Sequence, residues 1–217
     1  MNNIKRTIIA LLLVAGVMLV PATVSAQVNS NVTQTINTGT LTTAILDGSR
    51  NVVASPSAAM TAANFSFNCQ AVTGTLGSAS QRLYVINPSG TTAGQTWTLT
   101  LAATGNWENT GATRSYSYND PTVAEATAGC ANGQLTVNPS AGTVTTDCAS
   151  TACTTAVITK GGSTAMSGVT PVTILTSAVG TTVWRGYITN IGLSQQIPAE
   201  QPADSYTLPM TLTVTAA

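Results

Sequence analysis

The sequence is poor in charged and aromatic residues and contains no histidine. Only 6% of its 217 residues are charged and 5% are aromatic, whereas about 25% are charged in an ordinary soluble domain. Seven basic residues against seven acidic ones leave no positive excess, so binding to nucleic acid is not expected. Without histidine the chain lacks the commonest general base and metal ligand. These absences argue against an enzyme, and the sequence predicts neither a cofactor nor a metal centre.

Residues that favour strands are abundant. Threonine occurs 40 times, and β-branched residues fit the pleated surface of a sheet better than a helix. A mean hydropathy of +0.25 without net charge also argues against intrinsic disorder. The composition therefore favours an all-β fold over a helical bundle.

Apolar and polar residues alternate with a period of two in about ten short runs separated by Gly, Pro, Asn and Ser. This pattern predicts a β-sandwich of about 8–10 strands with Greek-key-like connections. Residues 57–64 are long enough for one or two helical turns. The predicted strand runs are 40–46, 63–72, 83–86, 97–101, 134–137, 143–146, 156–159, 172–177, 183–191 and 206–215.

Residues 1–26 have the pattern of a secretory signal peptide. Lys5 and Arg6 precede an uncharged apolar stretch, and a small-residue cleavage site ends at Ala26. The apolar stretch is shorter than the roughly 20 residues that a membrane-spanning helix needs. We expect an exported protein, secreted or at the cell surface, with one β-sandwich domain over 27–217 and no membrane span after cleavage. Residues 27–39 are polar and are expected to form an arm or an edge strand.

The four cysteines fit this export prediction. An even number of cysteines in an exported chain suggests two disulfides. The simplest pairing joins Cys148 to Cys153 and Cys69 to Cys130. Because the spacings do not supply C-x2-C pairs, a zinc site is not predicted.

Residues 104–133 are richer in charged and aromatic residues than the rest of the chain. We interpret this segment as a long connection with little regular structure, either packed on the surface and held by Cys130 or carrying function. Its carboxylates offer the hard oxygen ligands that Ca²⁺ prefers, although no calcium-binding motif is present. They belong to Glu108, Asp120 and Glu125.

Two segments carry a resemblance to a known family. Residues 83–87 (LYVIN), a Gly-containing turn and residues 95–99 (QTWTL) resemble the first motif of WxL-domain surface proteins of Gram-positive and related bacteria. The final strand run resembles the second motif of that family. This chain has Asn87 where the family usually has Asp, and Met210 where the second Trp would stand. Trp97 and Leu99, two residues apart on one strand, are expected to lie in the core.

The resemblance implies a non-catalytic module that associates non-covalently with the cell wall. Peptidoglycan or another polymer of the cell envelope would be its ligand. Trp107, Tyr116 and Tyr118 are then the candidates for stacking on sugars, because they cluster in a polar segment. The alternative is a structural subunit that self-associates into a surface fibre or pilus, with the N-terminal arm adding to a neighbour's sheet.

Overall fold

The computed structural model describes residues 34, 39–88, 96–123, 131–149, 153–178 and 183–216. The chain divides into residues 1–36 and residues 37–217, and the fold given below is that of the second part. The predicted signal peptide lies outside the described residues, as does the N-terminal arm apart from Gln34 and Gly39. No helix within the described ranges is long and apolar enough to cross a bilayer.

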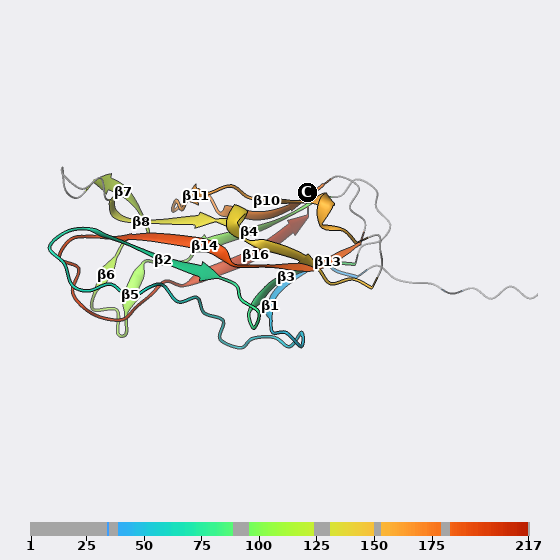
Figure 1. Ribbon diagram of the computed structural model, residues 1–217, viewed down its shortest axis with the longest axis horizontal. Coiled ribbons are helices and arrows are strands. Elements are labelled where there is room, and N and C mark those ends of the chain that lie inside the picture. Colours follow the sequence, from blue (N-terminus) through green and yellow to red (C-terminus); the bar gives the residue numbers. More distant parts are fainter. Residues whose placement is uncertain are drawn as a thin grey trace, which may run out of the picture. The chain divides into compact units, whose positions relative to one another are not determined.

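The described residues form an all-β fold in which every strand pair is antiparallel (Figure 1). Two short 3-10 helices, Pro139–Ala141 and Thr155–Val157, lie between strands. The strands are β1 (Thr42–Leu46), β2 (Gln70–Leu76), β3 (Arg82–Asn87), β4 (Trp97–Ala103), β5 (Trp107–Asn109), β6 (Ser115–Tyr116), β7 (Asn119–Val123), β8 (Ala131–Asn138), β9 (Thr143–Thr146), β10 (Ile158–Lys160), β11 (Thr164–Ala165), β12 (Val172–Ser177), β13 (Trp184–Thr189), β14 (Ile191–Ile197), β15 (Tyr206–Thr207) and β16 (Met210–Ala216).

Two of the sheets are joined end to end, because strands of one lead directly into strands of the other. The order β1-β3-β13-β9 in one sheet is continued by β2-β14-β8-β11 in the next, because β2 leads into β3, β8 into β9 and β13 into β14. At the junction the N–H of Asn190 donates to the carbonyl of Gly77. Both residues have positive φ, at 59° and 83°, a conformation that glycine and asparagine tolerate best. The junction therefore lets the paired strands change direction without separating.

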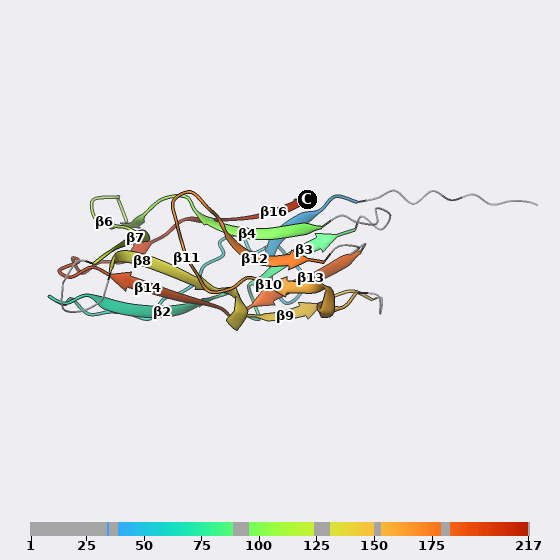
Figure 2. The same cartoon turned by 90° about the horizontal axis from the view of Figure 1, so that it is seen from above.

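Two further sheets complete the sandwich (Figure 2). One has the order β10-β12-β4-β16, and the other is the small sheet β15-β5-β6. Trp97 and Leu99 point inward from β4 and are 1% and 0% exposed, as the alternation of this strand predicts. The ring of Trp97 lies 5.3 Å from that of Trp184 on β13. These contacts confirm the core assignment of Trp97 and Leu99.

The period-two pattern locates most long strands correctly, including those at β1, β3, β4, β9 and β12. Three expectations are wrong. β2 begins only at Gln70, so residues 63–69 are not a strand. Residues 57–64 form no helix, and their one regular feature is an isolated bridge at Met60. Finally, the segment expected to lack regular structure contains β5, β6 and β7.

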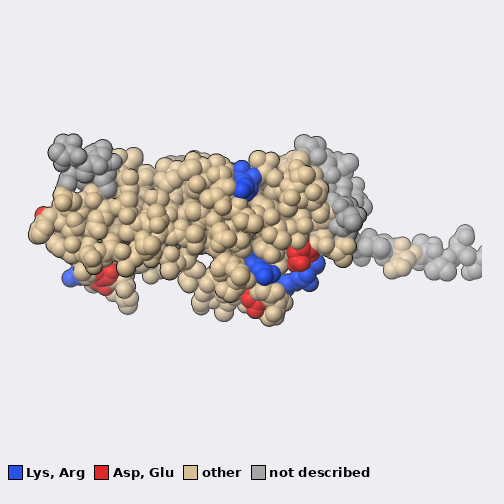
Figure 3. All heavy atoms as spheres, viewed as in Figure 1, with Lys and Arg blue, Asp and Glu red and all other residues tan. Residues whose placement is uncertain are grey.

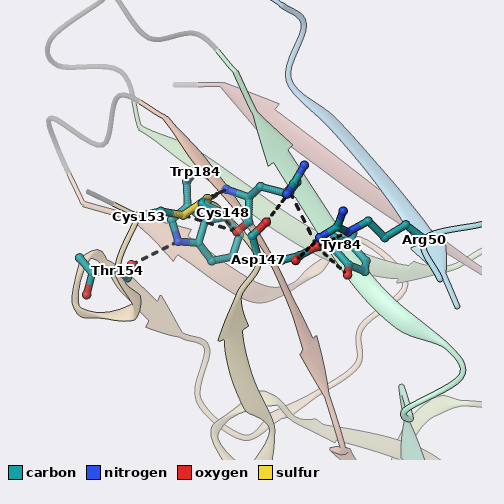
Figure 4. Close-up of a disulfide and its surroundings, with 8 residues drawn as sticks. Arg50, Tyr84, Asp147, Cys148, Cys153, Thr154 and Trp184 are labelled. Atoms are coloured by element: carbon teal, nitrogen blue, oxygen red, sulfur yellow. Dashed lines mark hydrogen bonds and ion pairs between the residues drawn. A yellow bond between two sulfur atoms is a disulfide. The ribbon is translucent and has the colours of Figure 1, made fainter. Parts of the chain in front are cut away.

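The Cys148–Cys153 disulfide forms as predicted and lies beside Trp184 (Figure 4). The indole N–H of Trp184 donates to the carbonyl of Thr154, 3.2 Å away. Cys69 is also disulfide-bonded, and its Sγ lies 3.7 Å from the carbonyl oxygen of Ala131. The predicted partner, Cys130, lies outside the described residues, so this second pairing stays a prediction.

Asp147, next to this disulfide, joins three parts of the fold (Figure 4). Its carboxylate accepts hydrogen bonds from Arg50 at 2.6 and 2.7 Å and from the hydroxyl of Tyr84 at 3.0 Å. The guanidinium of Arg185 lies 3.7 Å away. Chiefly because of the hydrogen bonds from Arg50, the pKa of Asp147 lies below its ordinary value. This carboxylate ties the turn after β1 to β3 and β13.

Candidate ligand cleft

Three aromatic rings gather on the small sheet. Trp107 and Tyr116 are cross-strand partners on β5 and β6, and their rings are stacked at 5.8 Å with an angle of 9° between planes. Tyr206 comes from β15, on the other side of β5, and meets the ring of Tyr116 edge-on at 5.1 Å. The contact between Tyr116 and Tyr206 joins residues 90 positions apart in the sequence.

The position of Trp107 is fixed by a buried amide. Its indole N–H donates to Oε1 of Gln195 at 2.7 Å. Gln195 is 0% exposed and points inward from β14, between Leu193 and Ile197 on the same face of the strand. The Gln195 side-chain amide donates in turn to the carbonyl of Gln196 at 2.6 Å. Since a buried polar group without a partner is costly, this pairing holds both side chains in place.

The aromatic cluster lines a cleft of about 440 Å³, which we call the aromatic cleft. Its other wall is formed by residues 58–66, which we call the strap, together with β2 and β14. The strap meets β2 through an isolated bridge between Met60 and Gly74 and a 2.7 Å hydrogen bond from Thr61 N–H to Thr73. A Cβ at position 74 would lie only 2.6 Å from the carbonyl oxygen of Ala59, so the strap requires glycine at this point.

Both phenylalanines of the chain are on this side of the fold and are exposed. Phe65, on the strap, is 51% exposed and lines the aromatic cleft, whereas Phe67 is 70% exposed and does not line it. Their rings meet edge-on at 5.2 Å. The core packs tryptophan and tyrosine while both phenylalanines face solvent, which favours a contact role for Phe65, the one that lines the cleft.

Polar groups surround the aromatic rings. The side-chain amide of Gln201 donates to the hydroxyl of Tyr206 at 2.8 Å, and that hydroxyl donates to the carbonyl of Pro202. Asp204 accepts a hydrogen bond from the Asn109 amide at 2.9 Å, and this bond lowers the pKa of its carboxyl group. Burial raises the pKa of the Tyr116 hydroxyl, so that group stays protonated at neutral pH. The cleft thus combines apolar ring faces with amide, hydroxyl and carboxylate groups.

The structure brings two of the three predicted sugar-stacking residues together. Trp107 and Tyr116 share the aromatic cleft, but they are half-buried members of a sheet rather than exposed loop residues. Tyr118 is only 8% exposed and belongs to the core. The prediction for Tyr118 is therefore wrong, because the chain turns this ring inward just before β7.

The carboxylates proposed as calcium ligands do not assemble among the described residues. Asp120 accepts hydrogen bonds from the backbone and hydroxyl of Thr122, and Glu108 lies on β5. Glu125 lies outside the described residues. Within those ranges no group of three or more His, Cys, Asp or Glu side chains is close enough to hold a metal ion.

Sequence reasoning missed Gln195, Tyr206 and Phe65. The polar residues Gln195 and Gln196 interrupt the alternation, so β14 was not predicted. Phe65 was assigned to the predicted strand 63–72, which begins only at Gln70 in the structure. A scan against family models, a search of curated proteins and a search of solved structures each find no match for this chain.

Proposed function

We propose that this protein is an exported, non-catalytic surface protein that binds cell-wall polysaccharide, with peptidoglycan as the ligand. The observation that carries the proposal is the aromatic cleft, where Trp107, Tyr116 and Tyr206 converge beside amide and carboxylate groups. Pockets that combine aromatic walls with a few placed polar groups are typical of small-ligand recognition. The resemblance to WxL-domain proteins at 83–87 and 95–99 supports the choice of a cell-wall ligand.

The chemistry of the cleft suits a sugar. The C–H face of a pyranose ring is apolar and can lie against an aromatic face, while its hydroxyl groups need hydrogen-bond partners. Among the rings that line the cleft, Phe65 is the most exposed, and Gln201 and Asp204 line the same cleft. An extended polysaccharide would place successive sugars along the strap.

The charge distribution also supports recognition of the sugar groups of the polymer rather than of its charges. Figure 3 shows a face on which charged side chains are sparse and most of them lie along the lower edge. The strap, residues 58–66, contains no charged residue. Contact with the strap itself is therefore expected to depend little on ionic strength, unlike binding driven by long-range charge.

A sedimentation assay with isolated peptidoglycan tests the proposal. The full-length mature protein should sediment with the wall material, and Phe65→Ala should weaken this binding by about tenfold, the loss typical of an interface contact worth 1–2 kcal/mol. Phe67→Ala is the matched control, because this equally apolar neighbour is more exposed but does not line the cleft. Equal losses in both variants, or no sedimentation of the unmodified protein, would contradict the proposal.

Trp107→Ala is a poorer test than Phe65→Ala. Because its indole is hydrogen-bonded to buried Gln195, truncation of Trp107 also disturbs the fold. Tyr206→Phe is more informative, since it removes the hydroxyl that Gln201 and Pro202 hold while keeping the ring. We expect this variant to fold and to bind peptidoglycan more weakly.

A second candidate function is self-assembly into a surface fibre, and one observation favours it. β16 stands at the end of its sheet with β4 as its hydrogen-bonded neighbour. Residues 205–217 contain no charged residue, whereas natural edge strands are commonly protected by charge. Electron microscopy of the concentrated protein would show fibres if this candidate is correct, and Thr213→Lys on β16 should prevent them.

A further inference from the structure

A second cavity lies next to the aromatic cleft and differs from it in chemistry. Its volume is about 300 Å³, and we call it the inner chamber. Ala58, Met60, Trp107 and Tyr206 line both cavities. The two cavities therefore meet at these four residues, between the strap and the aromatic cluster.

The lining of the inner chamber is mainly apolar. Seven of its 16 lining residues are leucines, and no residue with a charged side chain contributes. The leucines come from both layers of the sandwich, so the chamber reaches the hydrophobic core. They are Leu76, Leu83, Leu101, Leu135, Leu193, Leu208 and Leu212.

We infer that the inner chamber takes the aliphatic chain of a ligand whose sugar head lies in the aromatic cleft. This inference rests on the proposed function, since it gives the polysaccharide ligand a lipid end. An apolar cavity of about 150 Å³ already admits benzene, so the chamber has room for a chain of about eight carbons. The ligand class is an amphiphilic glycan, with a carbohydrate head and one aliphatic chain.

The strap provides a way in for such a chain. Met60 stands between the two cavities, and its unbranched thioether side chain adapts to irregular apolar contacts. Next to Met60, Ala58 is half-buried and packs against the core. Figure 3 shows the lower outline notched near the segment that follows β1 and is drawn in blue in Figure 1. Opening of the strap would break its bonds to β2 at Met60 and Thr61 but not the β2–β14 ladder.

Calorimetry with paired probes tests the inference. Octyl β-glucoside, used below its micelle-forming concentration, and methyl β-glucoside share one head and differ only in the chain. Each methylene group moved from water into an apolar site contributes about fourfold in affinity. Burial of only about three of the additional methylene groups would therefore make the octyl glycoside bind at least about 30-fold more tightly. Octanoate, which has a chain but no sugar, should bind more weakly than the octyl glycoside.

Two variants of the protein test whether the gain in affinity from the octyl chain arises in the inner chamber. Ala58→Phe should fill the space beside Met60 and remove the advantage of the octyl chain. Because Ala58 also lines the aromatic cleft, the measurement is the ratio of the octyl and methyl glucoside affinities, which should fall toward one. Ala54→Phe is the matched control, because Ala54 is exposed and lines neither cavity. If Ala58→Phe fails to fold, the comparison of probes on the unmodified protein still decides the question.

The outcomes separate this inference from the proposed function. Equal affinity for the octyl and methyl glycosides would overturn the inference, and the proposed function would stand if peptidoglycan still sedimented the protein. If octanoate bound as tightly as octyl glucoside, the sugar head would contribute nothing to the affinity, and the assignment of an amphiphilic glycan as ligand would be wrong. Tight, Ala58-dependent binding of octyl glucoside without peptidoglycan binding would support the chamber and contradict the wall polymer as ligand.

Discussion

The tryptophans at the two ends of the sandwich lie in different environments. Trp97 and Trp184 are 1% and 0% exposed and pack against each other where the main sheets close. Trp107, by contrast, is half-buried between two cavities and is held by an amide hydrogen bond and a stacked tyrosine. The end with Trp97 and Trp184, which we call the closed end, is thus built for stability, and the end with Trp107, the open end, leaves room for a ligand. Substitutions at the closed end should affect stability, and substitutions at the open end should affect binding.

The largest expected effect is at the closed end. Trp97→Ala should cost about 3–5 kcal/mol of the free energy of unfolding, the usual result for a buried large aromatic. This is a large share of the roughly 5–15 kcal/mol that holds a domain together. We therefore expect little soluble protein, measured as yield and as chemical denaturation of any folded fraction.

Thr98→Ala is the control for Trp97→Ala. Thr98 is the next residue of β4 and points to the opposite face, so its substitution should change stability by less than about 1 kcal/mol. If Trp97→Ala folded normally and lost only wall binding, the two ends would not differ as described and Trp97 would be a ligand contact.

Alternation predicted the closed end well because its strands have one apolar and one hydroxyl face. β4 and β16 both follow this pattern, with threonines pointing away from the core. The open end was harder to predict for physical reasons. β14 buries the polar Gln195, which breaks the expected alternation, and the strands of the small sheet have only two or three residues. The cleft itself depends on the contact of Tyr116 with Tyr206, which no local pattern reveals.

The next largest effect is expected at the open end, on substitution of Gln195. Gln195→Met keeps the length of a buried side chain but removes the acceptor for the indole N–H of Trp107. A buried donor left without a partner costs about 1–3 kcal/mol, and Trp107 should also shift in the cleft. We expect a lower midpoint of urea denaturation together with weaker peptidoglycan sedimentation. Loss of stability with unchanged binding would show that Trp107 does not shape the cleft.

Removing the short disulfide should have an effect of about 2 kcal/mol, the value that loop-closure entropy gives for so short a loop. The double variant Cys148→Ser/Cys153→Ser should therefore unfold at lower urea concentration and still bind peptidoglycan, because the bridge lies beside Trp184 at the closed end. Alkylation of the exported protein without reductant, followed by mass spectrometry, should label no cysteine. Labelling of Cys148 and Cys153 would contradict the bridge.

The smallest expected effect concerns pH and the Asp147 carboxylate. Its folded-state pKa is lowered, first by hydrogen bonds from Arg50 and also by Tyr84 and Arg185. The stabilisation is therefore present above the ordinary carboxyl pKa near 4 and is lost as pH falls through the lower folded value. Because Arg50 is 52% exposed, solvent screens the pair, and we expect Asp147→Asn to cost only about 1 kcal/mol at neutral pH.

The pH dependence of unfolding distinguishes Asp147 from an exposed carboxylate at the open end. Asp147→Asn should make the loss of stability between about pH 5 and pH 2 shallower, whereas Asp204→Asn, whose lowered pKa comes from Asn109 in solvent, should change this slope less. Asp47 and Asp120 also have lowered pKa values through local hydrogen bonds, so part of the slope should remain in both variants. If Asp147→Asn left the pH dependence of unfolding unchanged, the network with Arg50 and Tyr84 would not contribute to the stability of the closed end. A larger change in Asp204→Asn would assign the acid sensitivity to the wall of the cleft instead.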